Sequence, residues 1–320
     1  MARDGSGTYD RVHADYVDGT TIEADDINGE LNDMASALTQ SLSKDGQTVP
    51  TANLPMGSFK LTGLSRGTGT GDSIRYDEFK AAFRSLLVGC GTSNNAGTPN
   101  TKIDVAAGSF TEAGQTAVFA LSAGTIDCGA TGANGLDAGS LANNTWYHSY
   151  AIAKADATTA LLASTSVSSP TMPSGYTLKR RIGSFKTNGS AQIIAFTQTG
   201  DRFEWTTATA DVSTTATASG NYTFNVPTGV SVVWFGAMKL SYTSGTGSLT
   251  VSLLAPGQSA PSGTAHVGFV AAANAIDQCY VEMRTNTSAQ VAFRGDGTGS
   301  LVGSIGIVTQ GWIDRRGRDD

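Results

Sequence analysis

The chain has 320 residues, a formal net charge of −6 and 39% hydrophobic residues, which is enough apolar content to build packed cores. Only 15% of the residues are charged, below the roughly 25% of average globular proteins, whereas glycine contributes 39 residues. This composition favours short strands and tight turns. The lysines and arginines form no long basic stripe, so the sequence excludes nucleic acid as an expected partner.

The three cysteines, Cys90, Cys128 and Cys279, show no paired spacing and are an odd number, so we expect free and mainly buried thiols. Residues 1–20 lack the apolar segment of a secretory signal. No window approaches the ~20 apolar residues that span a bilayer, so we expect no membrane insertion. The sequence predicts synthesis and folding in a reducing cytoplasm.

Charge density divides the chain near residue 90. Residues 1–89 contain 8 Lys or Arg and 13 Asp or Glu, whereas the longer remainder, 90–320, contains only 13 and 14. We interpret residues 1–89 as a helical amino-terminal region. Residues 90–100 are rich in Gly, Asn and Ser, which is typical of a linker.

Two apolar stripes predict two helices in residues 1–89. The first helix is capped by Asp25 or Asp26 and runs to residue 42, and the second begins near Ser73 and ends at Gly89. The stripes either pack on each other within one small domain or meet the same stripes of other copies in a parallel bundle. In the bundle interpretation, the trimer seam consists of Ile27, Leu31, Met34, Leu38, Leu42, Phe79, Phe83 and Leu86.

Beyond residue 100, short runs with a period of two are separated by turn residues. This pattern predicts a mainly β fold with β-sandwich or jelly-roll-like distal domains at residues 101–205 and 220–320. Residues 206–219 have almost no large apolar side chain, which predicts a Thr/Ala-rich linker. A Thr-rich edge strand is the alternative.

Several segments resemble bacteriophage tail fibre and related virion fibre proteins. They are residues 45–64 (DGQTVPTANLPMGSFKLTGL) and the strings LANNTWYHSYAI, MPSGYTLKRRIGSF and GWIDRR. The resemblance implies a fibrous homotrimer in the virion. Its amino-terminal region would attach to other tail or neck proteins, and its β-domains would contact a host surface glycan or protein. The resemblance favours the bundle interpretation of the helices.

Two further functions stay open beside the tail fibre. A head or neck fibre, or an adaptor without receptor binding, would share the same segments. A tailspike polysaccharide depolymerase would need a pair of catalytic carboxylates, but residues 90–320 hold only 14 acidic residues and show no β-helix repeat. We therefore expect a structural, non-enzymatic protein.

No spacing predicts a catalytic, metal or cofactor site, because His13, His148 and His266 each lack a neighbouring ligand residue. The alternation around His148 indicates a hydrogen-bonded sheet residue, or an aromatic platform for a sugar ring. If the protein binds a receptor, the candidate contacts are its large aromatic side chains, Trp146, Tyr147, Trp234 and Trp312.

Three consecutive basic residues interrupt the predicted strand at residues 176–186. Alternation along the strand directs Arg180 to one face and Lys179 and Arg181 to the other, so one arginine is drawn inward. Arg180 is interpreted as forming an ion pair with Glu204 or Asp201 at an interface. The alternative is an anchor for an acidic surface glycan.

Overall fold

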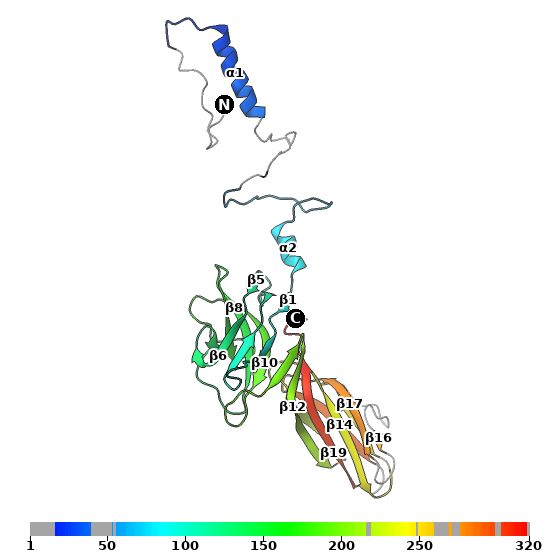
Figure 1. Cartoon of the computed structure of the whole chain (residues 1–320). Coiled ribbons are helices and arrows are strands. Elements are labelled where there is room, and N and C mark those ends of the chain that lie inside the picture. Colours follow the sequence, from blue (N-terminus) through cyan, green and yellow to red (C-terminus); the bar gives the residue numbers. More distant parts are fainter. Residues whose placement is uncertain are drawn as a thin grey trace. The chain divides into compact units, whose positions relative to one another are not determined.

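The computed structural model describes residues 17–39, 53, 56–215, 219–247, 249–258, 269–270, 276–297 and 302–318. The chain divides into two compact units, Met1–Ser65 and Arg66–Asp320. Strands dominate, and the described residues form two helices (Figure 1), which confirms the mainly β fold with a short helical amino-terminal region. Among the helices of the described segments, none is both long and apolar enough to cross a membrane.

The first helix, α1 (Ala24–Thr39), forms the regular part of the first unit. It begins earlier than predicted, so Asp25 and Asp26 lie in its first turn instead of preceding it. There their carboxylates interact favourably with the positive end of the helix dipole. Leu42, which was predicted to extend the helix, lies outside the described residues.

The second helix, α2 (Tyr76–Ala82), is shorter than the predicted span from Ser73 to Gly89. At its start, the backbone N–H of Arg75 donates to the Glu78 carboxylate at 3.2 Å. After the helix, Ser85 has a positive φ of 56°, and the chain then enters β1 (Leu87–Gly89). The apolar residues that suggested a longer helix therefore belong in part to a strand.

Two sheets form the first β body, which contains β1 to β10. The smaller sheet has the order β1-β4-β5, with β4 (Gly108–Thr111) and β5 (Val118–Leu121). The larger sheet has the order β10-β8-β9-β7-β6-β3-β2 and is antiparallel except where β7 pairs with β6 and β9. Its strands are β2 (Thr92–Asn94), β3 (Lys102–Val105), β6 (Gly124–Thr131), β7 (Gly135–Leu136), β8 (Trp146–Ala153), β9 (Thr159–Ser164) and β10 (Leu178–Lys186).

The second β body pairs a five-stranded sheet with a four-stranded sheet. The five-stranded sheet has the order β11-β12-β19-β14-β17, and the four-stranded sheet has the order β13-β18-β15-β16. Its strands are β11 (Phe196–Thr199), β12 (Arg202–Thr215), β13 (Gly220–Thr223), β14 (Val233–Ser244), β15 (Leu249–Leu254), β16 (Phe269–Val270), β17 (Ile276–Arg284), β18 (Gln290–Gly297) and β19 (Val302–Ile313).

Both predicted linkers contain strands. Most of the Thr/Ala-rich segment lies in β12, which is paired with both β11 and β19 and buries Val212 against the core. The segment 90–100 contains β2, whose Thr92 is also buried. A segment of small polar residues shows no hydrophobic alternation in its sequence. Its backbone N–H and C=O groups nevertheless form hydrogen bonds with neighbouring strands as other residues do.

Aromatic rings join the two β bodies. Trp146 of β8 contacts Trp205 of β12 at a centroid distance of 5.8 Å and Trp312 of β19 at 5.5 Å. Phe203 stacks on Trp312 at 5.1 Å. One continuous cluster of buried side chains therefore runs through both bodies.

The cysteines are free, as predicted. Cys90 and Cys128 are buried, and Cys279 is half-buried. Burial raises the pKa of Cys128 to about 12, and the neighbouring Asp127 carboxylate acts in the same direction. This thiol therefore stays protonated at neutral pH.

Replacing Trp312 tests whether the aromatic cluster stabilises the unit. Trp312 is fully buried, so Trp312→Ala is expected to lower the free energy of unfolding by about 3–5 kcal/mol in denaturant titrations followed by circular dichroism. The control is Val88→Ala, because Val88 belongs to the same unit and is 61% exposed; we expect a change within about 0.5 kcal/mol. Equal effects of the two substitutions would contradict this role.

Candidate functional site

The carboxyl-terminal segment after β19 is held on the first β body by a two-point ion pair. Arg181 of β10 donates from Nη1 and Nη2 to the two carboxylate oxygens of Asp314, at 2.5 and 2.8 Å. The Arg181 and Asp314 side chains are only 12% and 3% exposed. Such planar, paired contacts fix geometry as well as charge.

Arg316 adds a second attachment two residues later. Its side chain is 3% exposed, and it donates from Nη2 to Asp201 at 3.0 Å and from Nη1 to the backbone oxygen of Ile182 at 3.3 Å. Asp201 also accepts a hydrogen bond from Arg318. The segment 314–318 is thus tied to both β10 and the β11–β12 turn.

The two acidic residues named as partners for Arg180 form ion pairs with other arginines. Asp201 pairs with Arg316 and Arg318, and Glu204 pairs with Arg202 within its own strand. Arg180 is drawn inward as expected and is 4% exposed, but Arg181 makes the ion pair across the two bodies. A bulge between Arg181 and Gly183 shifts the register of β10 directly after these two arginines.

The charge of Asp314 is favoured by its surroundings. Burial acts to raise the pKa of this carboxyl group, but the positive charge of Arg181 and the hydrogen bonds from Arg181 and the Arg316 backbone outweigh it. The pKa of Asp314 therefore lies below its usual value, and the ion pair persists at neutral pH.

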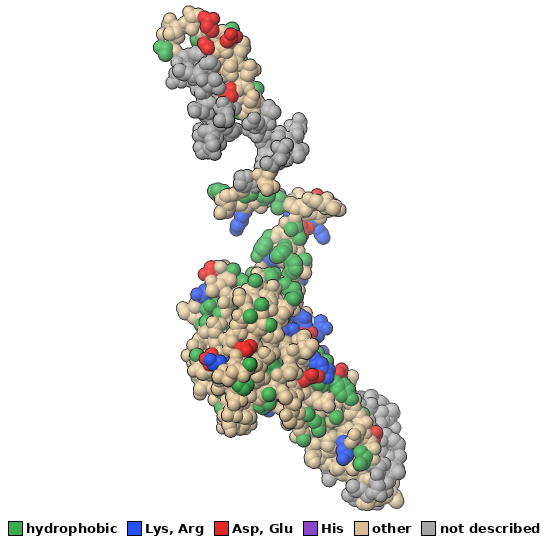
Figure 2. All heavy atoms as spheres, viewed as in Figure 1, with side chains coloured by type: hydrophobic (Ala, Val, Ile, Leu, Met, Phe, Trp, Pro, Cys, Tyr) green, Lys and Arg blue, Asp and Glu red, His purple; other side chains and the backbone are tan. Residues whose placement is uncertain are grey.

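Beside this attachment lies a hollow of about 440 Å³, which we call the basic hollow. Figure 2 shows Lys and Arg side chains gathered near the carboxyl-terminal end of the chain. Four of the residues that line the hollow are cationic, and no lining residue is acidic. The four are Lys179, Arg180, Arg181 and Arg316.

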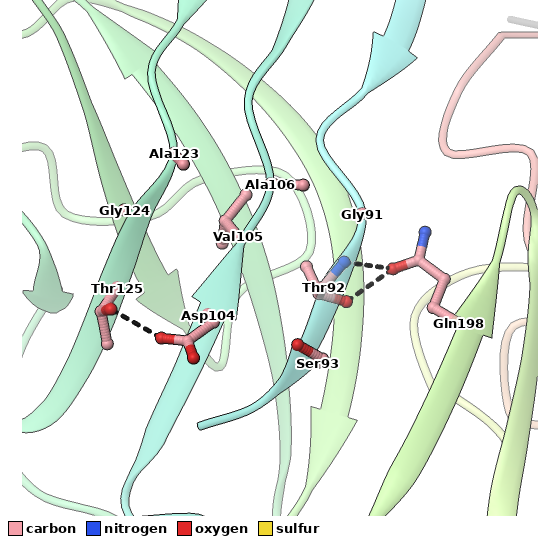
Figure 3. A pocket seen from close by; sticks show the side chains of 10 residues that line it. All are labelled: Gly91, Thr92, Ser93, Asp104, Val105, Ala106, Ala123, Gly124, Thr125 and Gln198. Atoms are coloured by element: carbon pink, nitrogen blue, oxygen red, sulfur yellow. Dashed lines mark hydrogen bonds between the residues drawn. The ribbon is translucent and has the colours of Figure 1, made fainter. Parts of the chain in front are cut away.

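A second hollow, of about 650 Å³, lies beside β2, β3 and β6 (Figure 3). Thr125 donates to the Asp104 carboxylate at 2.6 Å, and the backbone and hydroxyl of Thr92 both donate to Gln198 Oε1 at 2.7 Å. These polar groups hydrogen-bond to one another across neighbouring strands. They therefore stabilise the contacts between these strands, and fewer of them can bind a ligand.

Burial removes three of the four predicted receptor contacts from the surface. Trp234 and Trp312 are 0% exposed, and Tyr147 is 3% exposed. Trp146 is half-buried, because its ring packs against Trp205 and Trp312 and beneath Lys186 Nζ. Their size made them candidates for ligand contacts, but the same size makes them the main core residues.

His148 is a buried sheet residue, and its Nδ1 lies 2.9 Å from Ser184 Oγ. Burial lowers the pKa of His148 to about 4, and the positive charge of Arg181 adds to this effect, whereas the Asp314 carboxylate opposes it. The imidazole is therefore neutral at pH 7, and it packs beside the Arg181–Asp314 pair instead of forming a platform for a sugar ring.

The predicted seam residues of α1 are exposed. Ile27, Leu31, Met34 and Leu38 are 40%, 53%, 40% and 72% exposed. They lie on one stripe of the helix, as their spacing predicts.

The predicted seam residues of α2 are also accessible to solvent. Phe79 and Phe83 are 39% and 36% exposed, with ring centroids 4.7 Å apart, and Leu86 is half-buried. Figure 2 shows hydrophobic side chains gathered over α2. This helix belongs to the unit Arg66–Asp320, whereas α1 belongs to the other unit.

No sequence pattern predicted that Arg181, Asp314 and Arg316 are joined by hydrogen bonds in one network. The string GWIDRR contains an acid next to two bases, but nothing in it indicates a partner 133 residues earlier. Within the described segments, no group of three His, Cys, Asp or Glu side chains could hold a metal ion.

Residues 94–212 match a family model described as Mtd second domain. The match covers less than half of the chain, so it does not assign the whole protein to a family. No curated protein matches the chain.

The match corrects the identification made from sequence. The model is not described as a phage tail fibre, so that identification is not retained, nor are the structural function, virion localisation and non-enzymatic character derived from it.

No enzymatic activity is assigned from this match. Residues 94–212 contain strands and no helix, whereas dinucleotide cofactors commonly bind at strand-to-helix turns. The matched segment therefore contains no turn of this kind. The description of the model also names no reaction and no residue of this chain, so no catalytic step is assigned.

Breaking the Arg181–Asp314 pair tests the attachment of the carboxyl-terminal segment. Asp314→Asn leaves the Arg181 guanidinium buried without its counter-charge, and we expect a loss of about 3–5 kcal/mol in the free energy of unfolding. The double variant Arg181→Met/Asp314→Leu should recover much of the loss. Asp156→Asn, in an exposed turn, is the control. A double variant no more stable than Asp314→Asn would contradict the role of the pair.

The buried imidazole makes stability depend on pH. The pKa of His148 is near 6.5 in the unfolded chain but about 4 in the folded protein. Between pH 6.5 and pH 4, the imidazole is therefore protonated in the unfolded state and neutral in the folded state. Stability is expected to fall by roughly 3 kcal/mol as pH drops from 6.5 to 4. In His148→Gln the fall between pH 6.5 and 5 should be much smaller in urea titrations. If the wild type and His148→Gln lost stability equally with falling pH, His148 would not be the group responsible.

Proposed function

We propose that this protein is a homotrimer that binds a surface glycan or protein noncovalently, with α1 as its assembly element. The observation that carries the proposal is the exposed apolar stripe on α1, where Leu38 is 72% and Leu31 is 53% exposed. Water contact with four large apolar side chains on one stripe is unfavourable, and association with other copies would remove it.

The spacing of the stripe supports a parallel bundle of a few helices. Ile27, Leu31, Met34 and Leu38 are separated by 4, 3 and 4 residues, which is the a/d pattern of a coiled coil. This spacing places Leu31 and Leu38 at a positions, and Ile27 and Met34 at d positions. Leucine at a with isoleucine at d favours trimers or tetramers over dimers.

The contacts of α1 within its own unit leave this stripe available. Its buried side chains are Glu30 and Ala37, at 9% and 4% exposure, and they lie to one side of the stripe. A helix of 16 residues is also marginal in water by itself, so packing against copies would stabilise it. The proposal therefore accounts for both the exposure and the short length of the helix.

Trimerisation would serve binding through multivalency. We call the unit Arg66–Asp320, which holds both β bodies, the β unit. Three identical β units on one assembly raise the effective concentration of each site for a partner that presents repeated groups. A weak single site then suffices for durable attachment. A repetitive glycan is one such partner.

Disrupting the stripe tests the proposal. Light scattering on the full-length protein is expected to give three times the 32.9 kDa mass of one chain. In Leu31→Lys/Leu38→Lys, charges repel one another in the seam, so the mass should fall to that of one chain. The control is Asn28→Lys/Asn32→Lys, which adds the same charge to exposed positions away from the stripe and should leave the mass unchanged. A monomeric wild-type protein would contradict the proposal.

A further inference from the structure

We propose that the basic hollow is a binding site for one acidic sugar residue, a uronate, of an anionic glycan. This inference rests on the proposed function, since it identifies the chemistry of the partner that the β unit would bind.

The wall of the hollow carries an excess of positive charge. Lys179, Arg180, Arg181 and Arg316 line it, and none of its lining residues is acidic. The nearby carboxylates of Asp314 and Asp201 are engaged by Arg181, Arg316 and Arg318. Lys179 adds a further positive charge to this wall, and because the chain as a whole is negative, the positive potential of the hollow is a local property.

Two of the cations are removed from bulk solvent. Arg180 and Arg316 are each 4% exposed. A charged hydrogen bond is stronger where water is excluded, so an oxyanion in this hollow would interact more strongly than at an exposed lysine. A guanidinium group also fits both oxygens of a carboxylate at once.

The wall is held in place before any ligand binds. Arg316 is fixed by Asp201 and the Ile182 backbone oxygen, and Tyr150 donates its hydroxyl to the Ser166 backbone oxygen at 2.6 Å. Arg180 lies in β10, directly opposite Ala151 of β8. Binding would therefore require little ordering of the site, which lowers its entropic cost.

The remaining wall suits a sugar ring. Ser168 supplies a hydroxyl, and Val167 and Val230 supply apolar surface for the C–H face of a ring. A volume of about 440 Å³ lies within the ~300–1,000 Å³ of small-molecule sites. A nucleic-acid strand would require a stripe of cations along several phosphates, whereas these cations converge on one hollow.

Calorimetry on the full-length protein tests the inference, with trigalacturonate as the probe. We expect saturable binding to trigalacturonate, and at least about tenfold weaker binding to its methyl ester, which lacks the negative charge. Raising the salt concentration should weaken the binding of trigalacturonate. Equal affinity for the acid and the ester, or no binding to either, would overturn the inference.

Matched variants place the binding in the basic hollow. Lys179→Gln removes a half-buried charge and should weaken binding about tenfold or more. Arg180→Gln should do the same, with its fold checked by circular dichroism. Lys239→Gln removes an equal charge from an exposed position on β14, outside the hollow, and should not change affinity. Unchanged binding in the Lys179 variant, which is expected to fold, would overturn the assignment.

Two competing anions complete the test. Inorganic sulfate that binds as tightly as trigalacturonate would show a simple anion site and overturn the sugar assignment. If a single-stranded oligonucleotide bound more tightly than trigalacturonate, the ligand class would be nucleic acid, and the glycan assignment would be overturned. Because calorimetry reports affinity per site, a monomer that still binds the sugar would contradict the trimer alone, and a trimer that does not bind it would contradict the site alone.

Discussion

The buried ion pair between Arg181 and Asp314 is the contact on which the arrangement of the β unit depends. It joins β10 of the first β body to the residue that follows β19 of the second. Because both side chains are nearly inaccessible to solvent, neither charge can remain without the other. The pair therefore fixes the end of the chain against a strand that lies 133 residues earlier.

Apolar packing and charge reinforce each other at this junction. Trp312, two residues before Asp314, stacks on Phe203 and contacts Trp146, so the segment that enters the ion pair is already held in the core. Arg316, two residues after Asp314, reaches Asp201 and the Ile182 backbone. The same segment thereby contributes an aromatic ring to the core and a guanidinium group to the basic hollow, which is why structure and proposed binding are coupled here.

The two proposals assign different tasks to different units. The exposed stripe of α1 has the spacing for self-association, whereas the β unit holds the charged hollow. In an assembly of three copies, three modest sites then act together on a repetitive glycan. The match of residues 94–212 to the Mtd second domain covers much of the first β body and the start of the second, including Lys179, Arg180 and Arg181.

The sequence by itself determined the mainly β fold, the two helices, the free cysteines and the inward position of Arg180, because period, composition and spacing are local properties. Only the tertiary structure decided that Thr/Ala-rich residues form β12, that Trp234 and Trp312 are buried, and that Arg181 pairs with Asp314. A strand of small polar residues is stabilised by its neighbours, and a charge finds its partner through folding across a long stretch of chain. Neither effect leaves a pattern in the local sequence.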